Sequence, residues 1–176
     1  DTSGRREIQP RFTYNGNAWF VRSLKAYPDA LQEMNALKAA NNKNEATFNS
    51  GFKSNKGLSA GEFIRDSSAY AKLTSYHPDT MRYEVNNANN GYLVFSEIFY
   101  DDWRAEIDGK PVTVNKVDYT LRGIPVPAGK HNVKLYFDKG PESTNMIEKT
   151  LSIAILIGML VLIAMWLKSY TGKQEA

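Results

Sequence analysis

Few side chains in this sequence are of a type that could carry catalysis or bind a metal. His77 and His131 are the only imidazoles, and they do not fall at the spacing of a zinc finger or a helical metal site. We therefore expect no metal site, and interpret each histidine as a turn or strand-end residue. Ser67 and Ser68 lack the Gly-x-Ser-x-Gly elbow of a hydrolase, and no glycine-rich phosphate loop follows a strand. No cofactor is expected.

Acidic residues gather between positions 97 and 108 and could supply the carboxylate pair of a glycosidase. They are Glu97, Asp101, Asp102, Glu106 and Asp108. Such a pair must face a sugar from two sides, with the carboxyl groups roughly 5 to 10 Å apart. Turn chemistry explains the same residues, since Asp101-Asp102 and Asp108-Gly109 are both typical of turns. The turn interpretation is preferred, and an anchored glycoside hydrolase remains the weakest of three functional hypotheses.

Aromatic residues are a stronger signal for binding, because the chain has ten Tyr and three Trp. Trp19 and Trp103 are typical core residues of a β domain, although their rings could also stack on sugars. Tyr100 and Tyr119 lie near predicted turns and are the better candidates for surface contacts.

Composition excludes several classes of protein. The net charge of +3 arises from charges mixed along the chain, without a block of Lys or Arg, so nucleic-acid binding is not indicated. The chain has no cysteine, which excludes disulfides, thiol nucleophiles and cysteine metal sites.

The pattern of elements predicts a mainly β domain, an antiparallel β-sandwich or jelly-roll-like fold, over residues 14–138. A flexible lead-in is expected over 1–13, a strand over 18–26 and a short amphipathic helix over 29–41, with Asp29 and Gln32 in a capping arrangement. The segment that follows this helix reads as a loop with one brief strand. From Ser67 onward, two-residue alternation separated by turns predicts further strands over 68–76, 80–87, 92–99, 103–108, 111–117, 119–125 and 131–137.

Four residues are expected to shape turns. Asp108-Gly109 is the strongest turn signal, because a two-residue hairpin requires positive φ angles that Gly adopts at no steric cost. Pro127 and Gly129 are expected to form a second turn, before the last strand.

An uninterrupted run of uncharged, mostly aliphatic residues extends from Leu151 to Leu167. As a helix it would be roughly 26 Å long, close to the thickness of the bilayer core. The sequence thus predicts a linker over 139–149, a single transmembrane helix over 150–168 and a cytoplasmic tail over 169–176. The weak bias of Lys residues toward the tail places the β domain outside the membrane. The chain does not begin with Met, so we expect either processing or truncation, and a tail-anchored protein and the last piece of a polytopic chain both stay open.

The block from Gly91 to Phe137 resembles the C-terminal extracytoplasmic domain of YfhO-like bacterial membrane proteins. It reads GYLVFSEIFYDDWRAEIDGKPVTVNKVDYTLRGIPVPAGKHNVKLYF. The positions that carry the resemblance are Ser96, Glu97, Tyr100, Trp103, Ala105, Asp108, Gly109, Asp118, Tyr119, Leu121, Arg122, Val126, Pro127, Gly129 and His131. Gly16-Asn-Ala-Trp-Phe is similar to the segment that opens this domain in relatives.

The resemblance implies a large polytopic glycosyltransferase of the GT-C type, which uses a polyprenyl-phosphate sugar for modification of envelope glycan or lipid. The catalytic acid of such proteins lies in an early loop that has no counterpart here. The chain is thus expected to be a non-catalytic accessory domain in the bacterial inner or plasma membrane, which positions an acceptor or packs on the membrane body of the parent protein. The competing hypothesis is a stand-alone, membrane-anchored module that binds a glycan or a protein.

Contacts with an envelope glycan, or with the remaining transmembrane body, are expected from one dense stretch of aromatic and charged residues. The predicted contact residues are Tyr100, Asp102, Trp103, Arg104, Tyr119 and Arg122. The bilayer is the other expected partner.

Overall fold

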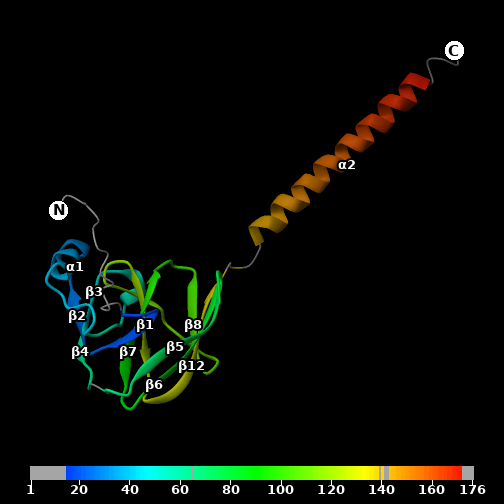
Figure 1. Cartoon of the computed structure of the whole chain (residues 1–176). Coiled ribbons are helices and arrows are strands. Elements are labelled where there is room, and N and C mark those ends of the chain that lie inside the picture. Colours follow the sequence, from blue (N-terminus) through cyan, green and yellow to red (C-terminus); the bar gives the residue numbers. More distant parts are fainter. Residues whose placement is uncertain (1–14, 65, 139, 141–142, 172–176) are drawn as a thin grey trace, which may run out of the picture. The chain divides into compact units, whose positions relative to one another are not determined.

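Twelve strands and two α-helices make up the part of the chain that the computed structural model describes, which is residues 15–64, 66–138, 140 and 143–171. In chain order the elements are β1 (Ala18–Val21), β2 (Ser23–Tyr27), α1 (Ala30–Leu37), β3 (Glu45–Asn49), the 3₁₀ turn η1 (Lys53–Asn55), β4 (Gly61–Glu62), β5 (Tyr70–His77), β6 (Thr80–Asn87), β7 (Gly91–Ile98), β8 (Trp103–Ile107), β9 (Lys110–Val112), β10 (Asn115–Val117), β11 (Leu121–Val126), β12 (Gly129–Phe137) and α2 (Ser143–Thr171). They form two units, 1–138 and 139–176 (Figure 1). The prediction of a mainly β fold with antiparallel sheets and a short N-terminal helix is confirmed.

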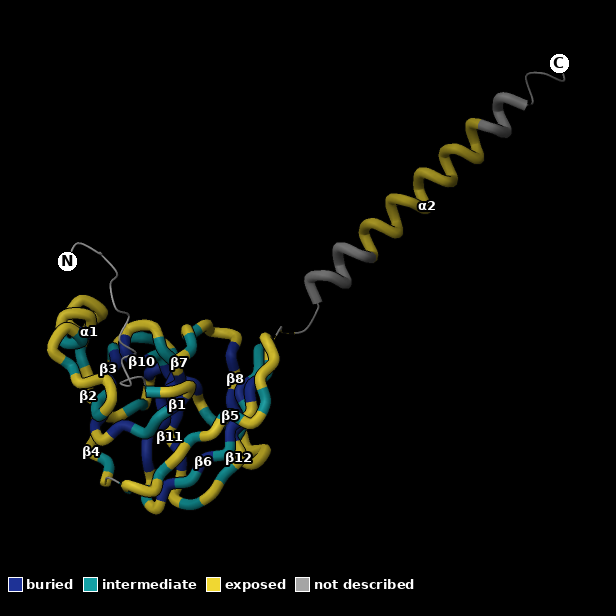
Figure 2. The backbone as a smooth tube through the Cα atoms, viewed as in Figure 1, coloured by how far each residue is buried: buried dark blue, intermediate teal, exposed yellow. Residues whose placement is uncertain are grey.

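The first unit contains three sheets. A four-stranded sheet has the order β1-β7-β11-β10, a five-stranded sheet the order β5-β6-β12-β8-β9, and a three-stranded sheet the order β3-β2-β4. The four- and five-stranded sheets face each other across one apolar core, to which Phe95 and Ile124 contribute from one side and Val85 and Leu135 from the other. Figure 2 shows that the buried residues of this unit lie along the strands of these sheets.

Strand β7 is buried on both faces. Leu93 and Phe95 point into the core between the two large sheets, whereas Tyr92 and Val94 belong to a second apolar core with Leu24 and other residues of the three-stranded sheet. All four side chains are at most 1% exposed. A continuous apolar run, rather than alternation, is typical of a strand that is covered on both sides.

Two predicted strands are each divided between two sheets. The segment 18–26 breaks at Arg22, so that β1 pairs with β7 while β2 pairs with β3 and β4. The segment 111–117 breaks in the same way, with β9 in the five-stranded sheet and β10 in the four-stranded one. Periodicity alone does not reveal such a change of sheet, because side-chain alternation continues through the bend.

The three-stranded sheet departs from the predicted all-antiparallel arrangement. Strands β2 and β3 run parallel, with Leu24 opposite Ala46. Parallel neighbours require a crossover connection, and α1 supplies it. The predicted cap is confirmed, since the Asp29 carboxylate accepts a hydrogen bond from the Gln32 N–H at 2.9 Å. The helix ends at Leu37, earlier than the predicted 29–41.

The second unit contains α2, whose described side chains run from Thr150 to Trp166 and are exposed throughout (Figure 2). Among the described residues, no helix combines the length and the apolarity that crossing a bilayer requires. The predicted transmembrane span at 150–168 is therefore not supported, although a helix does occupy this segment. The predicted lead-in at 1–13 lies outside the described residues, as do positions 139, 141 and 142 of the predicted linker and 172–176 of the predicted tail. Helix α2 begins at Ser143, within the segment predicted as linker.

We predict that Phe95→Ala destabilises the first unit by about 3 to 5 kcal/mol, because it removes a fully buried ring and leaves a cavity. The Phe95 ring also meets Tyr83 edge-on, with centroids 5.1 Å apart. Ile98→Ala on the same strand is the matched control, since Ile98 is 58% exposed and its loss should cost less than about 0.5 kcal/mol. Denaturant unfolding of the full chain measures both values, and equal losses would contradict the central role of β7.

Candidate binding site

The predicted contact residues lie at the end of the sandwich where β12 finishes and the chain leaves the first unit. The Asp138 N–H donates to the Asp102 carbonyl oxygen at 2.8 Å, which ties the end of β12 to the turn between β7 and β8. In that turn Tyr100 is 59% exposed. The Nη1 of Arg104 donates to the Asp101 carbonyl oxygen at 2.5 Å, and its Nε lies 3.6 Å from the Asp138 carboxylate.

Trp103 and Arg122 do not lie on this surface. They are 7% and 3% exposed, and the Arg122 guanidinium carbon lies 3.7 Å from the centroid of the Trp103 ring. Its Nε donates to the Ile98 carbonyl oxygen at 2.8 Å. Burial lowers the pKa of Arg122, and the nearby carboxylate of Glu97 opposes this shift. The stacked pair thus supports the turn from inside the domain. Only the exposed residues near it could contact a ligand directly.

Tyr119 lies on a second turn, between β10 and β11, that adjoins the first. The Phe99 N–H donates to the Thr120 carbonyl oxygen at 2.7 Å and joins the two turns. Tyr119 is 37% exposed and has a φ of 66°, and the Lys116 Nζ lies 5.2 Å from its ring centroid. We call the exposed surface formed by Tyr100, Asp102, Arg104 and Tyr119 the turn face.

The opposite end of the sandwich contains the predicted turn residues. Asp108 and Gly109 have φ angles of 50° and 78° and connect β8 to β9 as a two-residue turn. Gly129 opens β12 with a φ of 116°, two residues after Pro127. The Asn132 N–H donates to the Asp108 Oδ1 at 2.8 Å, so the hairpin turn is held against β12.

His131 completes this attachment. Its Nδ1 lies 2.6 Å from the Asp108 Oδ2, and its Nε2 lies 3.2 Å from the Ala128 carbonyl oxygen. Both partners accept hydrogen bonds, so the arrangement favours a ring that is protonated on both nitrogens. The hydrogen bond to Asp108 raises the pKa of His131, while the Asn132 N–H and His131 together lower the pKa of Asp108.

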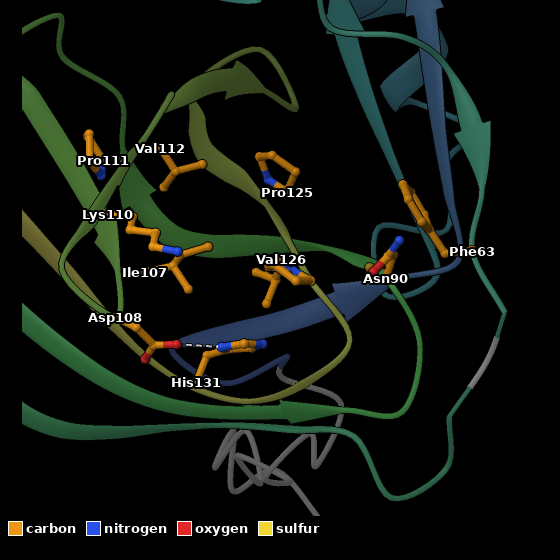
Figure 3. A pocket seen from close by; sticks show the side chains of 12 residues that line it. Phe63, Asn90, Ile107, Asp108, Lys110, Pro111, Val112, Pro125, Val126 and His131 are labelled. Carbon is orange, nitrogen blue, oxygen red and sulfur yellow. Dashed lines mark hydrogen bonds and ion pairs between the residues drawn. The ribbon is translucent and has the colours of Figure 1, made fainter.

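A pocket of about 580 Å³ opens beside this pair (Figure 3). Most of its wall is apolar, with Ile107, Val112 and Val126 among the lining residues, and prolines 111, 125 and 127 also line it. We call it the proline pocket. Sequence reasoning missed it, because Asp108 and His131 are 23 positions apart and share no local spacing. The available signal was that both fall within the block that resembles YfhO-like proteins.

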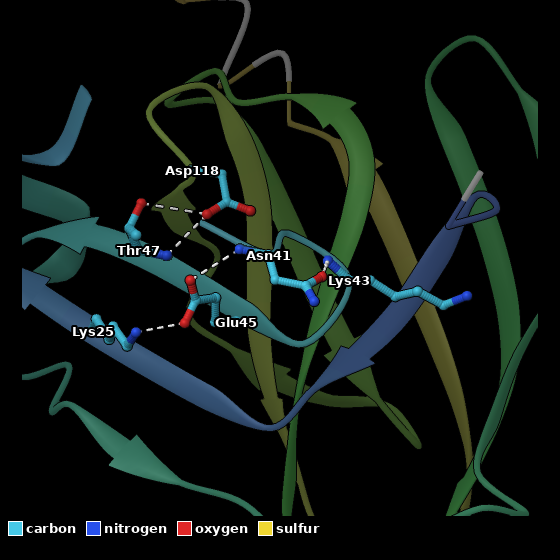
Figure 4. Close-up of polar contacts among 6 residues, drawn as sticks. All are labelled: Lys25, Asn41, Lys43, Glu45, Thr47 and Asp118. Carbon is cyan, nitrogen blue, oxygen red and sulfur yellow. Dashed lines mark hydrogen bonds and ion pairs between the residues drawn. The ribbon is translucent and has the colours of Figure 1, made fainter. Parts of the chain in front are cut away.

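Two buried carboxyl groups, those of Glu33 and Asp118, meet elsewhere in the first unit, around Thr47 of β3. Figure 4 shows the contacts of Asp118 with Thr47. The Asp118 Oδ1 accepts from the Thr47 N–H at 2.8 Å, and the Glu33 Oε1 accepts from the Tyr119 N–H at 2.9 Å. The Thr47 Oγ1 lies 3.3 Å and 3.5 Å from the same two carboxylate oxygens. Glu45, which pairs with Lys25 at 2.5 Å, adds a further negative charge nearby.

Burial raises the pKa of both carboxyl groups. For Asp118 the pKa reaches about 6, because loss of water and the charges of Glu33 and Glu45 outweigh the hydrogen bonds from Thr47. Burial also raises the pKa of Glu33, against the effect of the Tyr119 N–H. The Asp118 Oδ2 has no hydrogen-bond partner within the described part of the chain. This pair joins α1 and β3 to the turn before β11.

The acidic stretch considered for glycosidase chemistry does not gather as a whole. Asp102 and Asp108 flank opposite ends of β8, roughly 20 Å apart along an extended chain. The Glu106 Oε2 lies 3.7 Å from the Lys134 Nζ, and the Asp108 carboxylate is paired with the His131 ring. Across the described residues, no three His, Cys, Asp or Glu side chains come together as a metal site.

Comparison with known families places these surfaces in context. Residues 62–139 match the family described as bacterial membrane protein YfhO. This stretch of the chain is YfhO-like. It contains the turn face and the whole lining of the proline pocket, whereas Glu33 and Thr47 lie outside it. No curated protein and no solved structure matches the chain. The resemblance of the block from Gly91 to Phe137 to YfhO-like proteins is thereby confirmed.

We predict that Asp118 makes the stability of the first unit depend on pH. Its pKa is higher in the folded state than in the unfolded chain, so it contributes stability at low pH that is lost as pH rises through about 6. Between pH 5 and pH 8 this loss amounts to about 1.5 kcal/mol. Denaturant unfolding at both pH values should show a smaller loss for Asp118→Asn than for the unaltered chain. Parallel pH dependences for the two proteins would show that Asp118 titrates normally.

Proposed function

We propose that this chain contributes a non-catalytic, extracytoplasmic domain to a membrane glycosyltransferase-like protein. The parent protein would use a polyprenyl-phosphate sugar to modify envelope glycan or lipid, and the domain would position the acceptor or pack on the membrane body. The YfhO-like match to a bacterial membrane protein family supports the association with a membrane. The glycosyltransferase role rests on the resemblance of the block from Gly91 to Phe137.

The turn face is the observation that carries the proposal. Tyr100 and Tyr119 expose aromatic rings on two adjoining turns, and the guanidinium of Arg104 lies close to the first of them. Aromatic rings stack on the apolar faces of sugars, while guanidinium and carboxylate groups bond to hydroxyls. The buried pair of Trp103 and Arg122 supports the turns from beneath, so these groups are held in place before a ligand arrives.

The bonding of His131 supports a binding role over a catalytic one at the proline pocket. A general base needs a free ring nitrogen, whereas both nitrogens of His131 face acceptors, Asp108 and the Ala128 carbonyl. The residue is thereby committed to holding the hairpin against β12.

The second unit is proposed to attach the protein to the membrane. Between Leu151 and Trp166 its large apolar side chains are each more than half exposed. Exposed apolar surface of this extent marks a site of contact with lipid or protein. Attachment through α2, with the first unit on the extracytoplasmic side, would keep the turn face close to a membrane-bound acceptor.

We predict that Tyr100→Ala and Tyr119→Ala each weaken binding of isolated envelope polysaccharide by about 1 kcal/mol, roughly fivefold, through loss of a stacking surface. Saturation-transfer NMR on the full chain measures the binding. Tyr70→Ala is the matched control, since Tyr70 is 38% exposed and lies at the start of β5. If neither turn-face variant changes binding while the fold is retained, the turn face is architectural and does not bind glycan.

We also predict the side of the membrane on which the first unit lies. The chain has no cysteine, so a single cysteine introduced as Asp79→Cys, in the turn between β5 and β6, reports its own accessibility. A membrane-impermeant maleimide added to intact spheroplasts should label this variant as fully as it does after the membrane is permeabilised. Labelling that appears only after permeabilisation would place the β domain inside and overturn the extracytoplasmic assignment.

A further inference from the structure

The proline pocket is separate from the turn face. Its residues come mainly from β9, the ends of β8 and β11, and the starts of β7 and β12, whereas the turn face lies where β12 finishes. Strand β12 has nine residues, which corresponds to roughly 26 Å between its two ends. A ligand in the proline pocket would therefore leave the turn face free.

The walls of the pocket disfavour an extended peptide. Pro111 lies on β9, at the edge of the five-stranded sheet, and Pro125 lies on β11 beyond the residues that pair with β10. Neither proline has an N–H group, so a strand added at either position would lose one ladder hydrogen bond there. The pocket volume of about 580 Å³ falls instead in the range typical of small-molecule sites, roughly 300 to 1,000 Å³.

One positive charge in the pocket, that of Lys110, is not held in an ion pair, although it acts at a distance on the Asp108 carboxylate. Figure 3 shows the Lys110 side chain beside that of Ile107, its partner across the hairpin. Within the described part of the chain, Lys110 forms no salt bridge. The other two charged groups, Asp108 and His131, bond to each other at 2.6 Å. A negative group on a ligand would thus find an ammonium group without a salt-bridge partner at an apolar wall.

We propose that the proline pocket binds a small amphiphile, a molecule with an apolar body and a single carboxylate or phosphate group. The apolar body packs against Ile107, Val112 and Val126, and the anionic group binds the Lys110 ammonium. Burial of aliphatic carbon gives the affinity, at about 0.8 kcal/mol per CH₂ group, and the charge selects among apolar molecules of similar shape. This site and its ligand class go beyond the glycan-binding role proposed for the turn face.

Titration of the full chain in nanodiscs of zwitterionic lipid tests the proposal. Octanoate is the probe, octanamide is its uncharged counterpart, and acetate carries the charge without the apolar body. Chemical shifts of the ¹³C-labelled methyl groups of Val112 and Val126 report occupancy of the pocket. We expect octanoate to shift both signals and to bind at least about tenfold more tightly than octanamide or acetate, as a charge-assisted hydrogen bond predicts.

Matched variants locate the charge. Lys110→Met keeps the length of the side chain but removes its ammonium, and should reduce octanoate affinity to that of octanamide. Lys56→Met removes an exposed lysine that does not line the pocket and should leave the affinity unchanged.

Three results would overturn the proposal. Equal affinity for octanoate and octanamide would show that charge is not recognised, and equal affinity for acetate would show that the apolar wall is not used. Octanoate binding that leaves Val112 and Val126 unshifted would place the ligand elsewhere. If the proposal holds, replacing part of the zwitterionic lipid by an anionic lipid identifies the source of the ligand. Competition with octanoate indicates a membrane lipid, and its absence indicates a soluble amphiphile.

Discussion

The burial of β7 on both faces is the constraint on which the rest of the first unit depends. Successive side chains of this strand point to opposite sides, so Leu93 and Phe95 complete one core while Tyr92 and Val94 complete the other. The five-stranded and three-stranded sheets therefore pack on opposite faces of β7. The Tyr92 ring packs closely against the backbone of the neighbouring β11, because a Cβ atom added to Gly123 would lie only 2.5 Å from the ring.

Much of the β architecture could be predicted from the sequence, because the signals were local. Strand β6 coincides with the predicted 80–87, and β7 differs by one residue at each end. The sheet changes within 18–26 and 111–117 could not be predicted in the same way. These changes depend on which partner strand lies alongside, and Arg22, where the first of them occurs, is not a residue type typical of a bend. The parallel pairing of β2 with β3 is likewise set by tertiary packing and not by local sequence.

Site residues were predictable in type but less so in position. Tyr100 near a turn was expected to be exposed, and it is. Trp103 and Arg122 were assigned to the same surface because both residue types favour ligands, yet stacking buries them together. The contact of Asp108 with His131 bridges two strands that adjoin only in the folded sheet, where Ile107 pairs with Val133. Spacing along the chain carries no information about such a contact.

The position of β12 has a mechanical consequence. This strand is the last of the first unit, and it is hydrogen-bonded on one side to β6 and on the other to β8. Tension directed along β12 from its C-terminal end would load both ladders in shear, so that the hydrogen bonds to β6 and to β8 would share the load. An edge strand, paired on one side only, would carry the same tension on a single ladder.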